Sequence, residues 1–294
     1  MISIIITAFH EPATMGRAIE AFLAQMPPDA ELLGVCPDLE TAAVVQDYAI
    51  RHSAVHHVRD AGRGKPAALT VALKAARGDI LMLSDGDVWV EDGAVGALAA
   101  VLEDAQVGAV SGRPVSVSPR GTMLGYWSHL LTDAGAHDVR IMRDRSGEFL
   151  VCSGYLFAFR RGLIECVPED ALAEDAVISH RIAEQGYRIR YAPEARVFVK
   201  YPTTYRDWLR QRVRSAGGYA QDYVRCSPVR MRSARLEIVQ GTPRALRYPR
   251  TLREFVWTLV LFAARLHLWA LVFVNVRLLN RPLGELWQRV ETTK

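Results

Sequence analysis

The sequence predicts an α/β fold with a mostly parallel, doubly wound sheet, helices on both faces and a hydrophobic helical segment at its C-terminal end. Three observations support this prediction. In the first half, short apolar runs without polar alternation, typical of strands buried on both faces, alternate with segments of helical periodicity. The chain has 294 residues, enough to bury a substantial core. Its last forty residues contain two long apolar runs.

The expected elements follow one another as strand–helix units. Strands are expected at residues 2–7, 31–36, 55–58, 80–84 and 107–111, with helices at 13–25, 41–52, 66–77 and 94–103. The less regular middle predicts helices at 123–138, 176–185 and 204–215 and strands at 155–160, 188–191 and 196–201. Gly186 and the Gly217-Gly218 pair are expected to end the second and third of these helices. No G-x-G-x-x-G follows the first strand, which counts against a nicotinamide dehydrogenase.

One apolar run ends in a pair of carboxylates. Residues 80–83 are all apolar and lead directly into Ser84-Asp85-Gly86-Asp87. The carboxyl end of such a strand lies in the crevice where open α/β sheets bind their ligands. Carboxylates spaced in this way can share a hard cation such as Mg²⁺ or Mn²⁺, which bridges substrate phosphates. The alternative interpretation is that Asp and Gly mark a turn.

Positive charge is concentrated in one part of the chain. The net charge is only +4, yet twelve arginines lie between Arg206 and Arg253, against Asp207, Asp222 and Glu237. Such a stretch suits anionic lipid, phosphates or nucleic acid. Because no helix-turn-helix, zinc-finger or RNA-binding strand motif accompanies it, we expect no nucleic-acid partner.

The cysteines and the first residues indicate a cytoplasmic catalytic domain. The four cysteines (Cys36, Cys152, Cys166 and Cys226) are widely separated, without a C-x-x-C pair. They predict neither a zinc site nor a disulfide framework, and they fit a reducing compartment. The chain starts with an apolar strand and no basic leader, so we expect no secretory signal.

The C-terminal apolar segment has a composition near the balance point for membrane insertion. Thirteen Leu, Val or Phe residues lie between Phe255 and Val276. At about −0.3 to −0.6 kcal/mol each, they compete with about +2.5 kcal/mol for a central arginine such as Arg265. Arg265 and His267 would lie about 200° apart on a helix, which prevents a single polar stripe. We expect a membrane-associated helix or two short helices broken near Arg265. A helix packed on the catalytic domain is the alternative.

Four ordered segments resemble the family-2 glycosyltransferases, which have the GT-A fold, a Rossmann-like arrangement with a mixed, mostly parallel sheet. The segments are "SIIITAFHEPATMGRAIEAFL", "GRGKPAALTVALKAARGDILMLSDGDVWVEDGAV", "LAEDAVISHRIAEQGYRIRYAPEARV" and "QRVRS". The last resembles the Q-x-x-R-W motif of the cellulose, chitin and hyaluronan synthase branch. The resemblance covers roughly residues 1–215.

The resemblance implies a nucleotide-sugar donor, expected to be UDP-linked, and a Mg²⁺ or Mn²⁺ cofactor. Asp87 would hold the metal, with Asp85 binding the ribose or sharing the ion, which would stabilise the departing diphosphate as a Lewis acid. In place of the acidic residues usual after the second strand, this chain has "VCPD", which leaves Asp38 as the candidate base contact. The other donor-binding residues that the resemblance implies are Thr7, Ala8, Glu11, Lys65, Gln211 and Arg214.

The resemblance also implies inverting transfer. Asp175 would be the general base, next to Glu174 in the family's acidic pair, although Asp175 alone would equally suit a helix cap. Gly154 matches the stretch beneath the sugar and the acceptor. Ser215 stands where the Q-x-x-R-W motif has its Trp, and Trp208 is the candidate replacement in the acceptor region. For Gln211 and Arg214 the alternative is a solvated basic helix.

The sequence therefore predicts a GT-A domain at 1–220, a basic linker or amphipathic region at 221–254 and a membrane-associated helical segment at 255–294. We expect a metal-dependent inverting glycosyltransferase at the cytoplasmic face of the cell membrane, with a lipid-linked or glycan acceptor. One alternative is a catalytically inactive nucleotide-sugar-binding membrane protein. Another is a nucleotidyltransferase, which should have a glycine-rich phosphate loop where "TAFHEP" stands.

Overall fold

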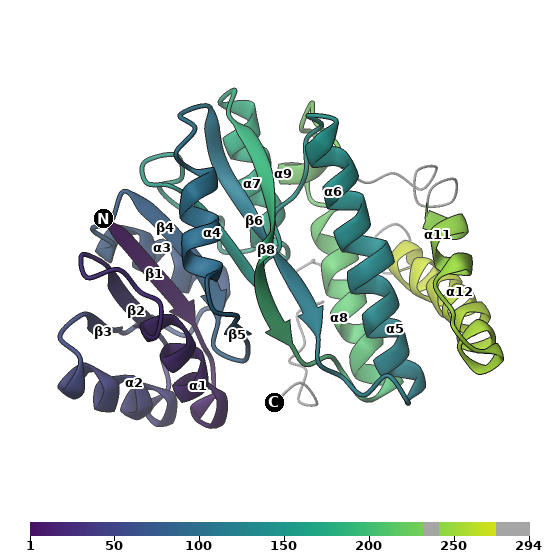
Figure 1. Cartoon of the computed structure of the whole chain (residues 1–294), viewed down its shortest axis with the longest axis horizontal. Helices are drawn as coiled ribbons and strands as arrows, with labels where there is room; N and C mark the ends of the chain where they lie inside the picture. The colour runs from purple at the N-terminus through teal and green to yellow at the C-terminus, as the bar shows by residue number, and fades with distance from the viewer. Residues whose placement is uncertain (232–240, 275–294) are drawn as a thin grey trace.

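The computed structural model describes residues 1–231 and 241–274, and its centre is an eight-stranded sheet (Figure 1). The strand order is β3-β2-β1-β4-β7-β6-β8-β5. The strands are β1 (Ile2–Thr7), β2 (Glu31–Val35), β3 (Val55–Val58), β4 (Ile80–Asp85), β5 (Trp89–Val90), β6 (Val107–Ser116), β7 (Leu156–Arg160) and β8 (Arg188–Val199). Parts of the expected segments at 221–254 and 255–294 lie outside the described residues.

The sheet is mixed and mostly parallel, as predicted. β1 to β4 run parallel to one another, and β6 runs parallel to β8. β7 is antiparallel to both β4 and β6, and the short β5 is antiparallel to β8. The two strands expected at 188–191 and 196–201 form one strand, β8, in which irregular register with β6 separates the two halves. This arrangement places the carboxyl ends of β1 and β4 side by side, with Thr7 opposite Asp85.

Helices cover both faces of the sheet. On one face, α1 (Pro12–Leu23) contacts β1 and β5, α2 (Leu39–Arg51) contacts β2 and β3, and α4 (Ala94–Val101) contacts β6 and β8. On the other, α3 (Lys65–Ala75) contacts β1, β2 and β3, and α7 (Glu174–Glu184) contacts β6 and β8. Strand residues alternate between these two cores: Ile4 and Ile6 belong to the first, and Ile5 to the second. Both faces are therefore buried, which explains the continuous apolar runs.

The helix expected at 123–138 differs from the prediction. It is α5 (Met123–Thr132), followed by a π-helical turn, η1 (Asp133–His137), and by α6 (Asp138–Arg145). Thr122 begins α5 by accepting a hydrogen bond from the Gly125 amide. The π-helical turn changes which side chains of the second half face the sheet, and the apolar periodicity does not reveal it.

The expected stop at Gly217-Gly218 is wrong, because α8 (Tyr205–Gly218) includes both glycines. A Cβ atom at Gly218 would lie 2.5 Å from the Cβ of Ala173 and 2.8 Å from its backbone nitrogen. Gly218 therefore permits close approach between α8 and the residue that precedes α7, rather than ending the helix. A short helix, α9 (Asp222–Arg225), follows, and α11 (Thr242–Arg247) comes after the undescribed segment.

The described part of the C-terminal apolar region is one continuous helix, α12 (Leu252–Phe273), so of the two expected arrangements the pair of short helices broken near Arg265 is wrong. Its buried residues fall on one stripe: Glu254, Thr258, Leu261, Ala264 and Leu268. This stripe packs against α5 and α8, and Figure 1 shows α12 at the edge of the molecule remote from α2. The helix is long and apolar enough to cross a membrane, with a mean hydropathy of 1.8, judged by length and composition alone.

Candidate active site

A cavity of about 200 Å³ opens beside the carboxyl end of β4. It is lined by β4, by the residues before β7, by the start of α7 and by α8. Seven of the residues singled out in the sequence line it: Lys65, Asp85, Gly154, Glu174, Asp175, Gln211 and Arg214. They come from segments as far apart as α3 and α8, so the fold gathers the family-like motifs around one space.

Lys65 links the acidic residues of two motifs. As the first residue of α3, it extends its ammonium to Oδ1 of Asp85 at 2.5 Å and to Oε1 of Glu174 at 2.8 Å. The exposed fractions of the three side chains are only 26%, 21% and 14%. Burial alone would lower the pKa of Lys65, but the two carboxylates outweigh it and raise that pKa above its ordinary value. Lys65 is therefore a permanent cation inside the cavity.

The pKa values of the two carboxylates that contact Lys65, Glu174 and Asp85, shift in opposite directions. Burial would raise the pKa of Glu174, but its contact with Lys65 outweighs burial and lowers that pKa. Burial also dominates at Asp85 and raises its pKa despite the contact with Lys65. Asp85 and Glu174 thus share Lys65 as a counter-ion, and Arg140, Arg212 and Arg214 add further positive charge to the cavity wall.

Asp175 is held by backbone amides at the start of α7. Its Oδ2 accepts a hydrogen bond from Gly154 N at 3.0 Å, and its Oδ1 accepts one from Ala176 N at 2.8 Å. Burial raises the pKa of Asp175, and the nearby Glu174 carboxylate raises it further. A carboxylate with a raised pKa and a fixed orientation on a cavity wall is suited to accept a proton.

The loop after β1 contacts the glycine between Asp85 and Asp87. A Cβ atom at Gly86 would lie 2.7 Å from the Cβ of Ala8 and 2.8 Å from Oε2 of Glu11, so only glycine allows this approach. Thr7 donates a long hydrogen bond of 3.5 Å to Oδ1 of Asp85. The expected donor-binding loop therefore lies directly against the paired aspartates.

Asp87 lies near the cavity without being among its lining residues. Burial raises the pKa of the Tyr155 phenol to about 12, and the charge of Asp87 contributes to this rise. Tyr155 does line the cavity, and its hydroxyl accepts a hydrogen bond of 3.3 Å from Nε2 of Gln211. Asp87 and Asp175 therefore border the same region, Asp87 through its neighbour Tyr155.

Residues 1–218 match the family model "Glycosyltransferase like family 2". The chain belongs to this family. It is 28% identical over 229 residues to the probable glycosyltransferase YdaM of Bacillus subtilis and 23% identical over 223 residues to the poly-beta-1,6-N-acetyl-D-glucosamine synthase of Staphylococcus epidermidis. Each match covers 74% of this chain and 54% of the relative, so the chain spans about half the length of the curated relatives it matches.

Solved structures support the fold of this glycosyltransferase. The mannosyltransferase PcManGT from Pyrobaculum calidifontis, solved with GDP-Man and Mn²⁺, superposes with a TM-score of 0.62 at 21% identity. That match covers 97% of this chain and 82% of the other. TarS (residues 1–349) of S. aureus superposes with a TM-score of 0.50 at 16% identity, covering 85% of this chain and 73% of TarS. The predicted GT-A fold is confirmed.

The acidic residues of the glycosyltransferase have the chemistry of a divalent-metal site. Asp85 and Asp87 flank Gly86 in the sequence, and Oε2 of Glu11 would lie 2.8 Å from a Cβ atom at Gly86; carboxylate oxygens are the ligands that Mg²⁺ and Mn²⁺ prefer. Within residues 1–231 and 241–274, no three His, Cys, Asp or Glu side chains are preassembled around one point. Lys65 occupies the position of a cation next to Asp85. The residues therefore fit a metal that binds together with substrate phosphates.

Six predicted site residues do not line the cavity: Thr7, Ala8, Glu11, Asp38, Asp87 and Trp208. Asp38 caps α2, with Oδ1 accepting from Thr41 N and Oδ2 accepting from His10 N, both at 2.9 Å. It thereby ties the loop after β1 to α2. Trp208 is 4% exposed and packs against Trp127 and Tyr205 beneath α12. The structure thus does not bring Trp208 to the acceptor region assigned to it from the sequence.

Several lining residues of the glycosyltransferase were not predicted. Tyr155 directly follows Gly154, and Arg212 lies inside the "QRVRS" segment. Their position next to motif residues could have identified them as site residues from the sequence. Arg140, Cys152 and Tyr201 also line the cavity, but no motif surrounds them. Only the packing of α6 and of the residues after β8 brings them there.

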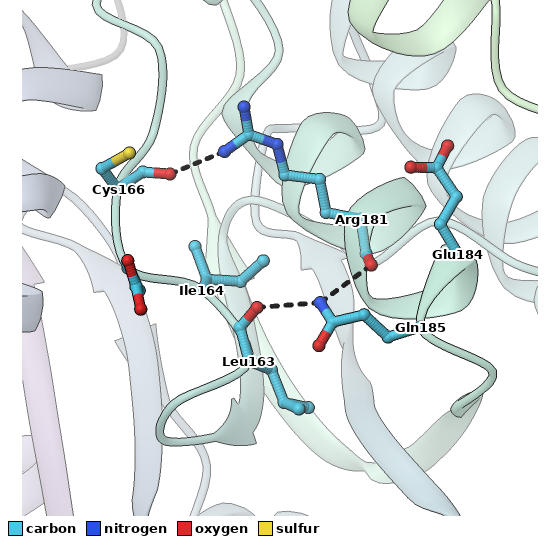
Figure 2. Close-up of a pocket in the computed structure, with 7 residues that line it drawn as sticks. Leu163, Ile164, Cys166, Arg181, Glu184 and Gln185 are labelled. Carbon is cyan, nitrogen blue, oxygen red and sulfur yellow. Dashed lines mark hydrogen bonds between the residues drawn. The ribbon is translucent and has the colours of Figure 1, made fainter.

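A second hollow lies between the loop after β7 and α7 (Figure 2). Two of its polar side chains, Arg181 and Gln185, are hydrogen-bonded to backbone carbonyls. Arg181 donates to the Cys166 carbonyl at 2.8 Å, and Gln185 donates to the Leu163 carbonyl at 2.9 Å (Figure 2). These contacts attach the loop to the helix, and we assign the hollow a packing role.

Proposed function

We propose that this glycosyltransferase transfers a sugar, with inversion, from a nucleoside-diphosphate sugar to an acceptor at a membrane surface. One relationship carries the proposal. Lys65 and Asp85, which form an ion pair, line the same cavity as Asp175, whose pKa is raised. A leaving diphosphate and an attacking acceptor need such groups on opposite sides of the anomeric carbon.

The donor diphosphate would be held by Lys65 and Arg214, both of which line the cavity. Arginine suits bidentate contact with phosphate, and lysine contributes a point charge. Asp85 and Asp87 would hold a Mg²⁺ or Mn²⁺ ion, which when bound supplies Lewis-acid stabilisation of the leaving group. The GDP-Man and Mn²⁺ in the PcManGT complex support this class of donor and cofactor. UDP-sugars and GDP-mannose are therefore the first donors to test.

Asp175 would accept the proton of the acceptor hydroxyl. The amides of Gly154 and Ala176 leave each carboxylate oxygen a further lone pair, so the group stays oriented while it accepts a proton. Because Glu174 is neutralised by Lys65, it would position Lys65 rather than act as a second base. Thr7, Ala8 and Glu11 would border the nucleotide at the carboxyl end of β1.

The exposed face of α12 supports a membrane surface as the working environment. Large apolar side chains on this face are exposed: Leu252, Val256, Leu259, Val260, Leu266 and Phe273. The opposite face is fixed to the domain, since Arg120 pairs with Glu254 at 2.8 Å and Tyr126 bonds Thr258 at 2.7 Å. A helix attached in this way would lie in the membrane interface instead of crossing it. Arg253, stacked over Trp257, would face anionic headgroups.

A panel of UDP-, GDP- and ADP-sugars, each with Mg²⁺, Mn²⁺ or EDTA, tests the proposal. We expect nucleotide release from one donor class, lost with EDTA and restored by Mn²⁺. Binding of the donor without any release, with membrane extracts supplied as acceptor, would instead indicate an inactive binding protein. Release of pyrophosphate would indicate a nucleotidyltransferase.

A further inference from the structure

The same cavity has a basic part, which we call its basic end. It comprises Arg140 of α6 and Arg212 of α8, together with Cys152 and Tyr201. The proposed donor contacts, Lys65 and Arg214, do not require these two arginines. Their presence in the same cavity therefore needs a separate explanation.

Arg140 is a buried cation that donates a hydrogen bond to a neutral carbonyl group. It is 8% exposed, and its Nε donates to the Val151 carbonyl at 3.1 Å. Among the residues that the structure describes, no carboxylate lies within ion-pair distance of Arg140, whereas the neighbouring Arg143 pairs with Glu148 at 3.1 Å. Burying a charge without a counter-ion is costly, so such a group in a cavity wall is suited to a ligand that brings the negative charge.

Arg212 adds positive charge from another helix, α8. Both arginines act on one group: burial raises the pKa of the Tyr201 phenol, while Arg212 and Arg140 each lower it. Tyr201 therefore lies within electrostatic range of both. Pro114, Leu131 and Ala136, which line the same cavity, add apolar surface. This end thus combines two cations with an apolar wall, which suits an anionic group attached to a hydrocarbon chain.

The basic end lies within reach of the proposed base. Burial raises the pKa of Cys152 to about 12; Arg140 lowers it and Asp175 raises it. Cys152 is thus close to both residues, and all three line one cavity. We infer that the Arg140 and Arg212 end binds a phosphate monoester carried by the acceptor, which is an amphiphile with an anionic head. This inference rests on the proposed function for its identification of the ligand as the acceptor.

Binding measurements on the full chain test the inference. With UDP and Mg²⁺ at saturation, so that the donor's diphosphate contacts are filled, farnesyl phosphate, farnesol and inorganic phosphate are titrated separately. We expect farnesyl phosphate to bind more tightly than inorganic phosphate and farnesol to bind at least tenfold more weakly, since it lacks the charged group. Arg140→Met should weaken the binding of farnesyl phosphate by about tenfold or more, and Arg140→Lys should weaken it by less.

Arg145→Met is the matched control, because Arg145 is an exposed arginine on the same helix. It makes the same charge change and should leave farnesyl phosphate binding within twofold. Unchanged UDP affinity and an unchanged melting temperature would show that Arg140→Met is folded. If Arg140→Met does not fold, the comparison is made with Arg140→Lys instead. Equal binding of farnesol and farnesyl phosphate, or farnesyl phosphate binding unaffected by either Arg140 variant, overturns the inference. If no nucleotide sugar binds, Arg140-dependent phosphate binding still stands and only the proposed donor chemistry fails.

Discussion

The backbone N–H of Gly154 donates a 3.0 Å hydrogen bond to Oδ2 of Asp175, joining the residues before β7 to the first turn of α7. A Cβ atom at position 154 would lie 3.3 Å from that same oxygen. The glycine therefore allows the amide to approach the carboxylate and fixes its direction. We propose that this contact orients the catalytic base.

Asp175→Asn should retain donor binding and lose transfer. An amide keeps the shape of the side chain but cannot accept the acceptor's proton, so the rate should fall by about 10²–10⁴-fold. Calorimetric titration with UDP or GDP and a transfer assay with the active donor measure the two properties. Asp92→Asn changes an exposed aspartate outside the cavity and serves as control. A normal transfer rate in Asp175→Asn would exclude Asp175 as the base.

Gly154→Ala should slow transfer without preventing folding. The added methyl group requires Asp175 to move by a few tenths of an ångström, which misaligns the base more than it disturbs the core. We expect the maximal rate to decrease while the KM for the donor stays nearly constant. Gly121→Ala is the matched control, because nothing lies within 4 Å of a Cβ there. An equal loss in both variants would contradict the positioning role.

Lys65→Met should weaken the binding of nucleoside diphosphate by about tenfold, the usual scale of one charge-assisted contact. It also leaves Asp85 and Glu174 without their shared cation, so the melting temperature should fall. Lys74→Met, an exposed lysine on the same helix, controls for the general loss of charge. Unchanged diphosphate affinity in Lys65→Met would remove Lys65 from the donor site.

Val256→Ser combined with Leu259→Ser should reduce binding to vesicles that contain anionic lipid. The two side chains are 49% and 47% exposed. Burying them in the membrane interface would increase the partitioning of the protein onto vesicles by roughly tenfold or more. Leu39→Ser with Ile50→Ser changes two even more exposed residues on α2 and should have no effect. Co-sedimentation measures both pairs. Equal binding of the wild type and the α12 pair would contradict the proposed membrane-facing role.

Stability should depend on Glu31 at neutral pH and lose that dependence in acid. Glu31 is 2% exposed and accepts hydrogen bonds from Ser3 at 2.5 Å and from the Arg77 amide at 2.7 Å. Burial opposes ionisation, but these bonds outweigh it and lower the pKa of Glu31 below its ordinary value of 4.5. The stabilisation is therefore present above the ordinary pKa and is lost as pH falls through the lowered one.

Glu31→Gln should accordingly cost about 1.5–3 kcal/mol of unfolding free energy at pH 7. The difference from wild type should shrink progressively below pH 4.5. Urea unfolding at several pH values measures it, with the exposed Glu103→Gln as control. A difference that stayed constant down to pH 3 would contradict the assigned ionisation.

The sequence predicted the central strands well but the connections around them less well. The apolar runs of β1, β2 and β4 are buried on both faces, so composition alone identifies them. The antiparallel insertion of β7 and the π-helical turn after α5 depend on packing between distant segments. The glycines at the end of α8 resembled a stop signal, although Gly218 serves the contact with Ala173.

By itself the sequence determined the fold family, the order of the strands along the chain and the candidate acids Asp85, Asp87, Glu174 and Asp175, because motif residues and apolar periodicity are local properties. Only the tertiary structure decided which of these side chains share a cavity, that Lys65 joins Asp85 to Glu174, and that Arg140 also lines that cavity. It also decided that α12 is one helix with one face docked and one exposed. These properties depend on burial and on charges brought together from distant positions, and no local pattern encodes them.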